Sequence, residues 1–281
     1  MRHSTEIIYQ QKANQVIDYI SLHLHKPLTL HVLAEKVGVS QRQLIRMMHS
    51  VLNEPLAAYI SRQRIERAVM YLQIEEMTLT TLANKVGYDN AQSFSKAFKK
   101  WYGISPMIYM QELRSRLEGF VESSDRNNNL YSEICEINDI ELVYIRIIGK
   151  YGDEDPYEIA WNKLLCFLKQ HDALSDKTRF IGISFDDPNI TDPNQCRFYA
   201  CASVHKMIIP TSELGTIQIK KGKYAIYTWE GSYSGLQQFY NSISVNFAHT
   251  IRHGVAFEEY LNSPRNTKEE DLRTKIYIPI K

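Results

Sequence analysis

The feature that most constrains the fold is an internal repeat within the first 100 residues. The stretch "TLHVLAEKVGVSQRQLIRMMHS", residues 29–50, returns as "TLTTLANKVGYDNAQSFSKAFKK", residues 78–100, with one extra residue after the glycine. The matched positions are Leu33-Ala34 with Leu82-Ala83, Val37-Gly38 with Val86-Gly87, and Leu44 with Phe94. Self-similarity of this kind indicates one supersecondary unit that is used twice.

Each copy predicts a short helix, a turn and a second helix. Apolar residues three and four apart give the helices an inward face, and Gly38 and Gly87 suit a turn that needs a positive φ. Ser40 in the first copy, and Asp89 or Asn90 in the second, can cap the second helix. A helix-turn-helix places its second helix in the major groove, so the repeat predicts two units that read DNA.

The exposed face of each second helix supplies the candidate DNA contacts, because Leu44, Met48, Phe94, Ala97 and Phe98 should turn inward. Arg and Lys can donate to guanine, Gln and Asn can pair with adenine, and trailing lysines suit phosphates. The predicted DNA-binding residues are Gln41, Arg42, Ile45, Arg46, Asn90, Gln92, Ser93 and Lys96, with Lys99 and Lys100 on phosphates. Trp101 and Tyr102 are expected to join Phe94 and Phe98 in holding the second helix to its domain.

Residues 55–73, between the copies, predict one connecting helix with Pro55 in its first turn. At 1.5 Å per residue this helix is about 27 Å long. It can hold two recognition helices about one DNA turn, about 34 Å, apart. The interpretation favoured for its Arg62, Arg64 and Arg67 is solvation of the helix rather than base contact.

The charge distribution favours DNA binding by the first part of the chain. Residues 1–120 carry 15 Lys and Arg against 10 Asp and Glu, whereas residues 121–281 carry 18 against 22. The net charges are therefore +5 and −4, and only the first part has a reason to approach a polyanion. One helix-turn-helix alone is more often packing than a DNA site, but two in tandem on the basic half favour double-stranded promoter DNA as the partner.

The composition changes after residue 118, and this change predicts a second domain. The stretch "GFVESSDRNNNLYSEI", residues 119–134, is polar and shows little periodicity, as expected of a linker. We expect an all-helical domain over 1–118, a linker over 119–138 and an α+β domain over 139–281. In the last of these, the order strand, Gly, Tyr, helix occurs at 148–151 and again at 230–233, which predicts a duplicated strand-helix-strand-strand unit.

Two such units would form a sheet with a groove between the halves, which is a natural ligand pocket. An acidic residue among aromatic walls suits a lipophilic cation. The predicted effector-binding residues are Tyr144, Trp161, Tyr227, Trp229, Tyr240, Glu258 and Tyr260. For Trp161 and Tyr240 core packing is an equal alternative, and for Glu258 the alternative is a surface carboxylate.

Other classes of protein find little support. The four cysteines show no Cys-x-x-Cys pair, and His249 and His253 have no third ligand and are better placed on a solvated helix face, so no metal and no cofactor are expected. No run of about 18 apolar residues could span a membrane, and the first residues lack the apolar core of a secretory signal, so the expected compartment is the cytoplasm.

Residues 12–112 resemble the DNA-binding domain of the AraC/XylS family of bacterial transcription regulators. The resemblance rests on Val86-Gly87-Tyr88, "SFSKAFKK" at 93–100, "YGISP" at 102–106 and Tyr109, with Leu44, Arg46 and "RIE" at 64–66 in support. Met110 stands where the family commonly has Arg, and Asn53-Glu54 replaces a usual Gly. The resemblance implies a DNA-binding regulator with RNA polymerase as a partner.

Residues from about 139 to 281 resemble the GyrI-like small-molecule-binding domain. This resemblance rests on the strand pattern, on "GSY" at 231–233, and on "FEEYLNSP" followed by "LRTKIYIPI". It implies a small-molecule effector, with Glu258 as the carboxylate that meets a cationic ligand. The order of the two modules resembles the Rob type of activator, so activation is expected.

Two alternatives remain for the second domain. It could act as a protein-interaction module that needs no ligand, or it could hydrolyse a small molecule with Glu258 and a nearby Tyr polarising water. Because no nucleophile, base and orienting group stand at a recognisable spacing, the prediction is that the chain is not an enzyme and has no catalytic residues.

Overall fold

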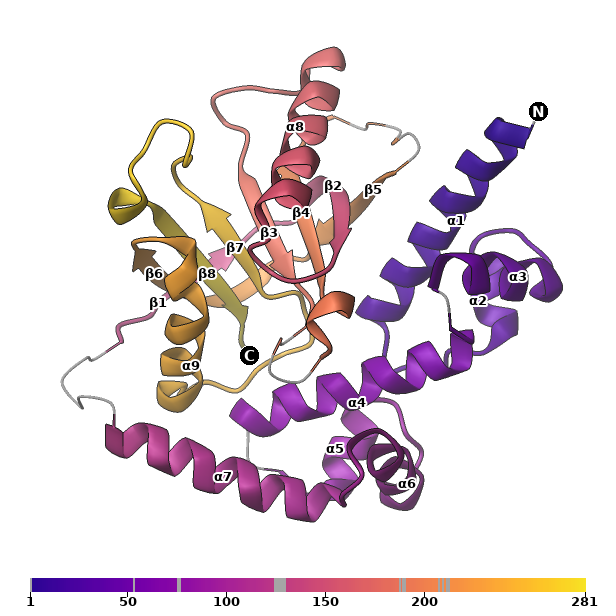
Figure 1. Cartoon of the computed structure of the whole chain (residues 1–281), viewed down its shortest axis with the longest axis vertical. Coiled ribbons are helices and arrows are strands. Elements are labelled where there is room, and N and C mark those ends of the chain that lie inside the picture. The colour runs from indigo at the N-terminus through magenta and orange to yellow at the C-terminus, as the bar shows by residue number, and fades with distance from the viewer. Residues whose placement is uncertain are drawn as a thin grey trace. The chain divides into compact units, whose positions relative to one another are not determined.

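The computed structural model describes residues 2–52, 54–74, 77–123, 130–186, 188, 191–206, 208, 210 and 213–281. The chain divides into two compact units, residues 1–129 and residues 130–281 (Figure 1). Every regular element described in the first unit is a helix, whereas the second unit combines a sheet with helices. This confirms the predicted fold class.

The first unit contains the two predicted helix-turn-helix units and the helix between them. Its helices are α1 (Arg2–Leu22), α2 (Leu30–Lys36), α3 (Gln41–Leu52), α4 (Leu56–Ile74), α5 (Leu79–Lys85), α6 (Ala91–Tyr102) and α7 (Pro106–Ser123). The repeat extends to the caps, because the Thr29 hydroxyl accepts from Val32 N and the Thr78 hydroxyl accepts from Thr81 N, both at 3.2 Å.

The core of the first helix-turn-helix unit includes two elements from outside the repeat, α1 and the start of α4. Helix α1 contributes a buried face that includes Val16, Ile17 and Ile20, and this face packs in one cluster with residues such as Leu33 of α2 and Leu44 of α3. A two-helix unit cannot bury both of its apolar faces alone, so α1 and α4 supply the other walls of this core.

The arginines of α4 have structural roles, and the interpretation of Arg62 and Arg64 as solvating charges is wrong. Arg62 is half-buried and donates to Glu54 at 2.5 Å and to Glu66 at 3.2 Å. Arg64 donates from Nε to the Leu24 carbonyl at 3.0 Å and from Nη2 to the Lys26 carbonyl at 2.8 Å. The two Arg64 bonds tie α4 to the segment that precedes α2.

Within the described residues, the second unit has one eight-stranded antiparallel sheet and the helices α8 (Glu154–Gln170) and α9 (Leu236–Asn246). The strands are β1 (Glu133–Ile137), β2 (Ile140–Ile148), β3 (Phe180–Ser184), β4 (Arg197–Ser203), β5 (Leu214–Ile219), β6 (Gly222–Glu230), β7 (Phe257–Tyr260) and β8 (Arg273–Pro279). Their order in the sheet is β1-β6-β8-β7-β3-β4-β2-β5.

This order reveals a duplication in which the first strands are exchanged. Each half consists of two strands, a helix and two more strands, so one strand precedes each predicted strand-helix-strand-strand unit. Strand β1 of the first half pairs with β6, and β5 of the second half pairs with β2. Strands β3 and β7 join the two halves at the centre of the sheet.

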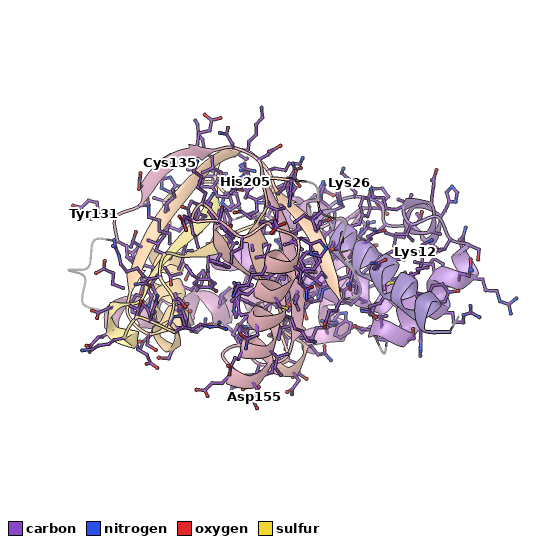
Figure 2. All side chains as sticks on the ribbon, turned by 90° about the horizontal axis from the view of Figure 1, so that it is seen from above. Lys12, Lys26, Tyr131, Cys135, Asp155 and His205 are labelled. Atoms are coloured by element: carbon purple, nitrogen blue, oxygen red, sulfur yellow. The ribbon has the colours of Figure 1, made fainter. Side chains whose placement is uncertain are left out.

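Two short connections force the sheet to curl. Strands β1 and β2 stand six places apart in the sheet, about 29 Å if it were flat, yet only Asn138 and Asp139 join them. A two-residue link reaches about 11 Å at most, so the two ends of the sheet must approach each other. Lys221, in the equivalent link between β5 and β6, donates from its backbone N to Asp139 Oδ1 at 2.6 Å. Figure 2 shows the resulting arch.

Different clusters of buried side chains pack on the two faces of the curled sheet. One face carries a single cluster that combines strands from both ends of the sheet and includes Tyr144, Tyr199, Tyr224 and Tyr277, as expected of an inner face. The other face carries two separate clusters, one under α8 and one under α9. The candidate ligand-binding groups described below lie on this helix-bearing face.

Two predicted boundaries differ from the structure. Helix α7 runs to Ser123 and β1 begins at Glu133, so both ends of the predicted linker 119–138 are regular structure, and residues 124–129 lie outside the described part. Helix α9 ends at Asn246, so the prediction that His249 and His253 lie on a helix is wrong. His249 Nε2 lies 3.3 Å from Ser132 Oγ.

Candidate nucleic-acid interface and ligand site

Helix α3 presents the predicted DNA-contacting residues of the first helix-turn-helix unit. Ser40 and Gln43 form a capping box, in which Gln43 N donates to Ser40 Oγ and Ser40 N donates to Gln43 Oε1, both at 3.2 Å. Leu44, Met47 and Met48 are buried against the core. The structure places Gln41, Arg42, Ile45 and Arg46 together on the exposed face of this helix. Ile45 is 49% exposed, so an apolar contact and charged donors are offered side by side.

The turns of the two helix-turn-helix units need glycine for different reasons. Gly38 has φ +59° and no atom within 4 Å of an added Cβ. Gly87 has φ +90°, and an added Cβ would lie 2.2 Å from the Leu24 carbonyl and 2.8 Å from the Arg64 guanidinium. The second turn therefore packs directly against α4 and the chain before α2, whereas the first needs only the backbone conformation.

Helix α6 presents the predicted DNA-contacting residues of the second helix-turn-helix unit, and aromatic side chains support it from beneath. Phe94 and Phe98 are fully buried, and the Phe98 ring stacks on Tyr102 with centroids 4.8 Å apart. The remaining predicted residues of this helix are all exposed: Gln92, Ser93, Lys96, Lys99 and Lys100. Lys99 and Lys100 lie in the last turn, where their charges also stabilise the helix C-terminus.

One prediction for this helix is confirmed and one needs correction. Asn90, one of the two predicted caps, is the N-cap, and its Oδ1 accepts from Ser93 N at 2.8 Å, while its contact with DNA stays a prediction. Trp101 is 40% exposed and is not part of the buried support, unlike its neighbour Tyr102. Tyr109 of α7, 5.4 Å from the Phe98 ring, contributes to that support instead.

The centre of the candidate ligand site is the carboxylate of Glu258, which is only 5% exposed. Tyr240 of α9 donates to Oε1 at 2.9 Å, and Tyr260 of β7 donates to Oε2 at 2.6 Å. Burial raises the pKa of Glu258, and the two tyrosine hydroxyls offset this only in part. Among the residues that the structure describes, no salt bridge to Glu258 is found.

Aromatic rings surround this carboxylate. The Tyr260 ring lies edge-on to Trp161 of α8, with centroids 5.9 Å apart, and to Tyr233, at 5.4 Å. Burial and the nearby Glu258 raise the pKa of Tyr233 to about 12. The structure therefore brings together four of the predicted effector residues, Trp161, Tyr240, Glu258 and Tyr260.

Sequence reasoning missed three contributors to this site. Tyr157 of α8 has a pKa raised by burial and by the Glu258 charge. Tyr233 stands in the "GSY" motif and could have been found there. Gly182 of β3 leaves the room that the Tyr260 hydroxyl occupies, because an added Cβ would lie 2.2 Å from that oxygen. Only the pairing of β3 with β7 reveals Gly182.

The other predicted effector residues lie elsewhere. Tyr144 is on the inner face of the sheet, where its ring stacks on Tyr199 at 4.2 Å, so it does not join Glu258. Tyr227 is buried in the core beneath α9. Trp229 packs on Phe239 of α9 at 5.1 Å and donates from Nε1 to the Ser232 carbonyl, in the turn between β6 and α9, at 3.1 Å.

The next residue shows why Glu258 and not Glu259 is the candidate. Glu259 points to the inner face and accepts both arms of Arg179, at 2.6 and 2.8 Å, and the Tyr277 hydroxyl at 2.6 Å. These donors hold the pKa of Glu259 below its usual value. Glu259 already has its cation, whereas the Glu258 carboxyl is desolvated and has no cationic partner among the described residues.

Within the described ranges, no group of three or more His, Cys, Asp or Glu side chains could hold a metal ion. The same residues include no helix that is both long and apolar enough to cross a membrane.

Comparison with known proteins agrees with this geometry. Residues 131–281 match the GyrI-like small molecule binding domain, and residues 33–112 match a helix-turn-helix domain. Rob of Salmonella typhimurium, named a transcriptional regulator, is 24% identical over 279 residues, which cover 92% of this chain and 94% of Rob.

Other similar proteins cover a smaller part of the chain. YkgA of Escherichia coli, named as a helix-turn-helix transcriptional regulator, is 31% identical over 104 residues, which are 37% of this chain and 44% of that protein. The chain thus spans less than half the length of this relative. Among solved structures, the DNA-binding domain of AdpA in complex with a target DNA is similar to 38% of this chain and 96% of that chain, with 22% identity and a TM-score of 0.37.

The two family models match one part of the chain each. The chain therefore belongs to the family of the GyrI-like small molecule binding domain, which it carries behind a helix-turn-helix domain of the AraC type.

Proposed function

We propose that the protein is a sequence-specific DNA-binding transcription regulator whose second unit senses a small lipophilic cation. The single observation that carries the DNA-binding part is the pair of capped helices, α3 and α6, which expose matching polar and cationic faces. The excess of positive charge on the first 120 residues supports the same assignment.

The observation that supports a cationic effector is the buried Glu258 among aromatic rings. A desolvated carboxylate attracts a cation strongly, and the rings of Trp161, Tyr233 and Tyr260 offer cation-π contacts to an aromatic or alkylated ammonium. A ligand of this class would replace the tyrosine hydroxyls as the partner of the carboxylate. We further expect action in the cytoplasm, activation of transcription and contact with RNA polymerase.

Titration of the full chain against genomic promoter fragments tests the DNA-binding part. The expected result is a selective shift with a Kd of about 10⁻⁸ M at physiological salt for the target site. Equal affinity for all fragments would reject a sequence-specific regulator.

A thermal-shift screen with lipophilic cations, such as tetraphenylphosphonium, tests the effector part. Stabilisation of wild type that is lost in Glu258→Gln supports a sensor. Stabilisation by nothing in the screen would favour a protein-interaction role for the second unit. Chemical turnover of a ligand, abolished in the same variant, would instead indicate a hydrolase.

A further inference from the structure

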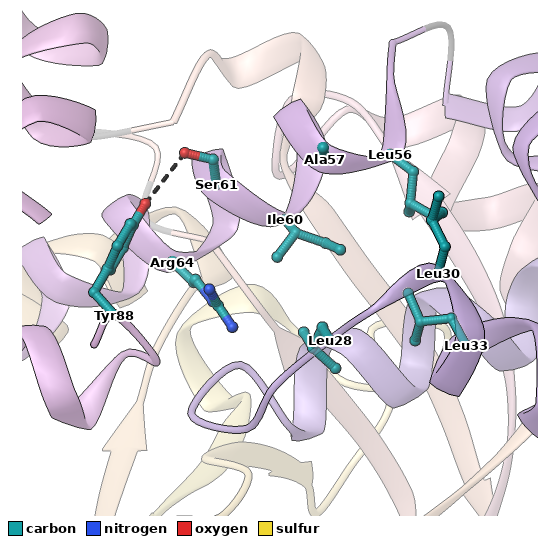
Figure 3. A pocket seen from close by; sticks show the side chains of 9 residues that line it. All are labelled: Leu28, Leu30, Leu33, Leu56, Ala57, Ile60, Ser61, Arg64 and Tyr88. Atoms are coloured by element: carbon teal, nitrogen blue, oxygen red, sulfur yellow. Dashed lines mark hydrogen bonds between the residues drawn. The ribbon is translucent and has the colours of Figure 1, made fainter. Parts of the chain in front are cut away.

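The first unit contains a groove of about 260 Å³ that the proposed function does not use (Figure 3). Its walls are four leucine side chains together with Ala57 and Ile60, contributed by α2, α4 and the segment before α2. Leu33, Leu56 and Ile60 form its buried floor, whereas Leu30 and Ala57 are exposed at its mouth. The volume lies just below the about 300–1,000 Å³ of sites for drug-sized ligands, so the groove suits a small apolar body.

One end of the groove is polar and cationic. The Arg64 guanidinium lines this end, and Ser61 and Tyr88 share a hydrogen bond of 3.2 Å beside it. The guanidinium lies 5.6 Å from the centre of the Tyr88 ring. Its two bonds to the Leu24 and Lys26 carbonyls use two of the five N–H donors that a guanidinium has.

The electrostatics of this end favour an anion. Burial is the largest influence on Arg64 and lowers its pKa, and the Asp89 charge and the Tyr88 hydroxyl oppose that effect only in part. A positive charge that is incompletely compensated at the end of an apolar groove attracts a negative group, and a guanidinium matches the planar geometry of a carboxylate.

We propose that this groove binds a small amphipathic anion, with a short alkyl body over the leucines and its anionic head at Arg64. The site is separate in sequence and in chemistry from the carboxylate site at Glu258, and it does not rest on the proposed function. The lining of the groove comes from the first helix-turn-helix unit, from α4 and from Tyr88 in the turn of the second helix-turn-helix unit. A ligand in the groove therefore contacts both helix-turn-helix units at once.

Isothermal titration of the full chain with octanoate, 1-octanol and octylammonium, all below micellar concentrations, tests the site. We expect saturable 1:1 binding of octanoate that is about tenfold tighter than binding of 1-octanol, because the head adds a charged hydrogen bond. Octylammonium should not compete with octanoate. Equal binding of octanoate and 1-octanol would overturn the role of Arg64.

Two variants locate the ligand. Ala57→Phe fills the groove from its exposed mouth without touching the buried floor, and it should abolish octanoate binding while the chain keeps its melting temperature. Glu258→Gln is the matched control and should leave octanoate affinity unchanged. Loss of octanoate binding in Glu258→Gln, or its retention in Ala57→Phe, would place the ligand elsewhere and overturn the proposal. A change of oligomeric state in Ala57→Phe, with no octanoate binding to wild type, would instead identify the groove as a contact between copies.

Discussion

At the scale of single residues, Glu258 combines two properties that seldom occur together. It is buried, and both of its recorded hydrogen-bond donors are neutral tyrosine hydroxyls. A carboxylate that is desolvated in the folded state but hydrated in the unfolded state lowers stability whenever it is ionised. The residue is therefore better explained by a ligand than by folding.

This argument gives a pH-dependent prediction for Glu258. Because burial raises its pKa in the folded state, the folded protein binds more protons than the unfolded one between the ordinary and the raised value. The contribution of Glu258 to stability should fall as pH rises through that window. Glu258→Gln removes this dependence, so its melting temperature should exceed that of wild type at pH 7 and match it near pH 4. A variant that is less stable than wild type at pH 7 would contradict this account.

Binding of a cation should show the opposite trend. The ionised carboxylate is the form that attracts it, so affinity for tetraphenylphosphonium should rise with pH through the same window. At pH 7 Glu258→Gln should weaken binding about 10-fold to 150-fold, the equivalent of about 1.5–3 kcal/mol for a charged contact. Calorimetry across pH measures both effects, and a pH-independent affinity would remove Glu258 from the site.

The two turn glycines form a matched pair for mutation. Gly87→Ala combines a positive φ with a contact of 2.2 Å to the Leu24 carbonyl, and it should cost about 2–4 kcal/mol. Gly38→Ala meets open space and should cost only about 1–2 kcal/mol. Denaturation followed by circular dichroism compares them, and equal losses would show that the close packing of the second turn is unimportant.

At the scale of elements, mutations on the exposed faces of α3 and α6 should change the sequence preference of DNA binding, whereas mutations of the lysines at the end of α6 should not. Arg46→Ala or Lys96→Ala should cost about 1–3 kcal/mol of binding and relax the preference for one base pair, if these side chains contact bases. The check is quantitative footprinting on single-base variants of the target site. A uniform loss of affinity across all variants would assign the contact to phosphate.

The elements themselves were largely predictable because their signals are local. The repeat, the threonine caps and the turn glycines define α2, α3, α5 and α6 within a few residues. The early end of α9 and the roles of Arg62 and Arg64 were not predictable, because they depend on partners elsewhere in the chain. The ligand site was likewise predictable only in part. The alternation along β7 places Glu258 and Tyr260 on one face, but the position of Gly182 beside them depends on the pairing of β3 with β7.

At the scale of the whole molecule, DNA affinity should depend strongly on salt because the positive charge is concentrated in the first unit. Each phosphate neutralised contributes about −0.9 to the slope of log K against log salt. Lys100→Ala should reduce the slope by about 1 and weaken all sequences alike. Titrations between about 50 and 200 mM salt measure the slope, and a slope unchanged by the mutation would exclude Lys100 from phosphate contact.

The exchanged first strands of the curled sheet have a consequence for the evolution of the second unit. Strand β1 completes the border beside β6, and β5 completes the border beside β2. After such a duplication neither half can be lost or transferred to another gene by itself. Each half depends on the other for one of its edge strands. If the proposed effector site is correct, we therefore expect its specificity to change by substitution around Glu258 and not by exchange of one half of the sheet.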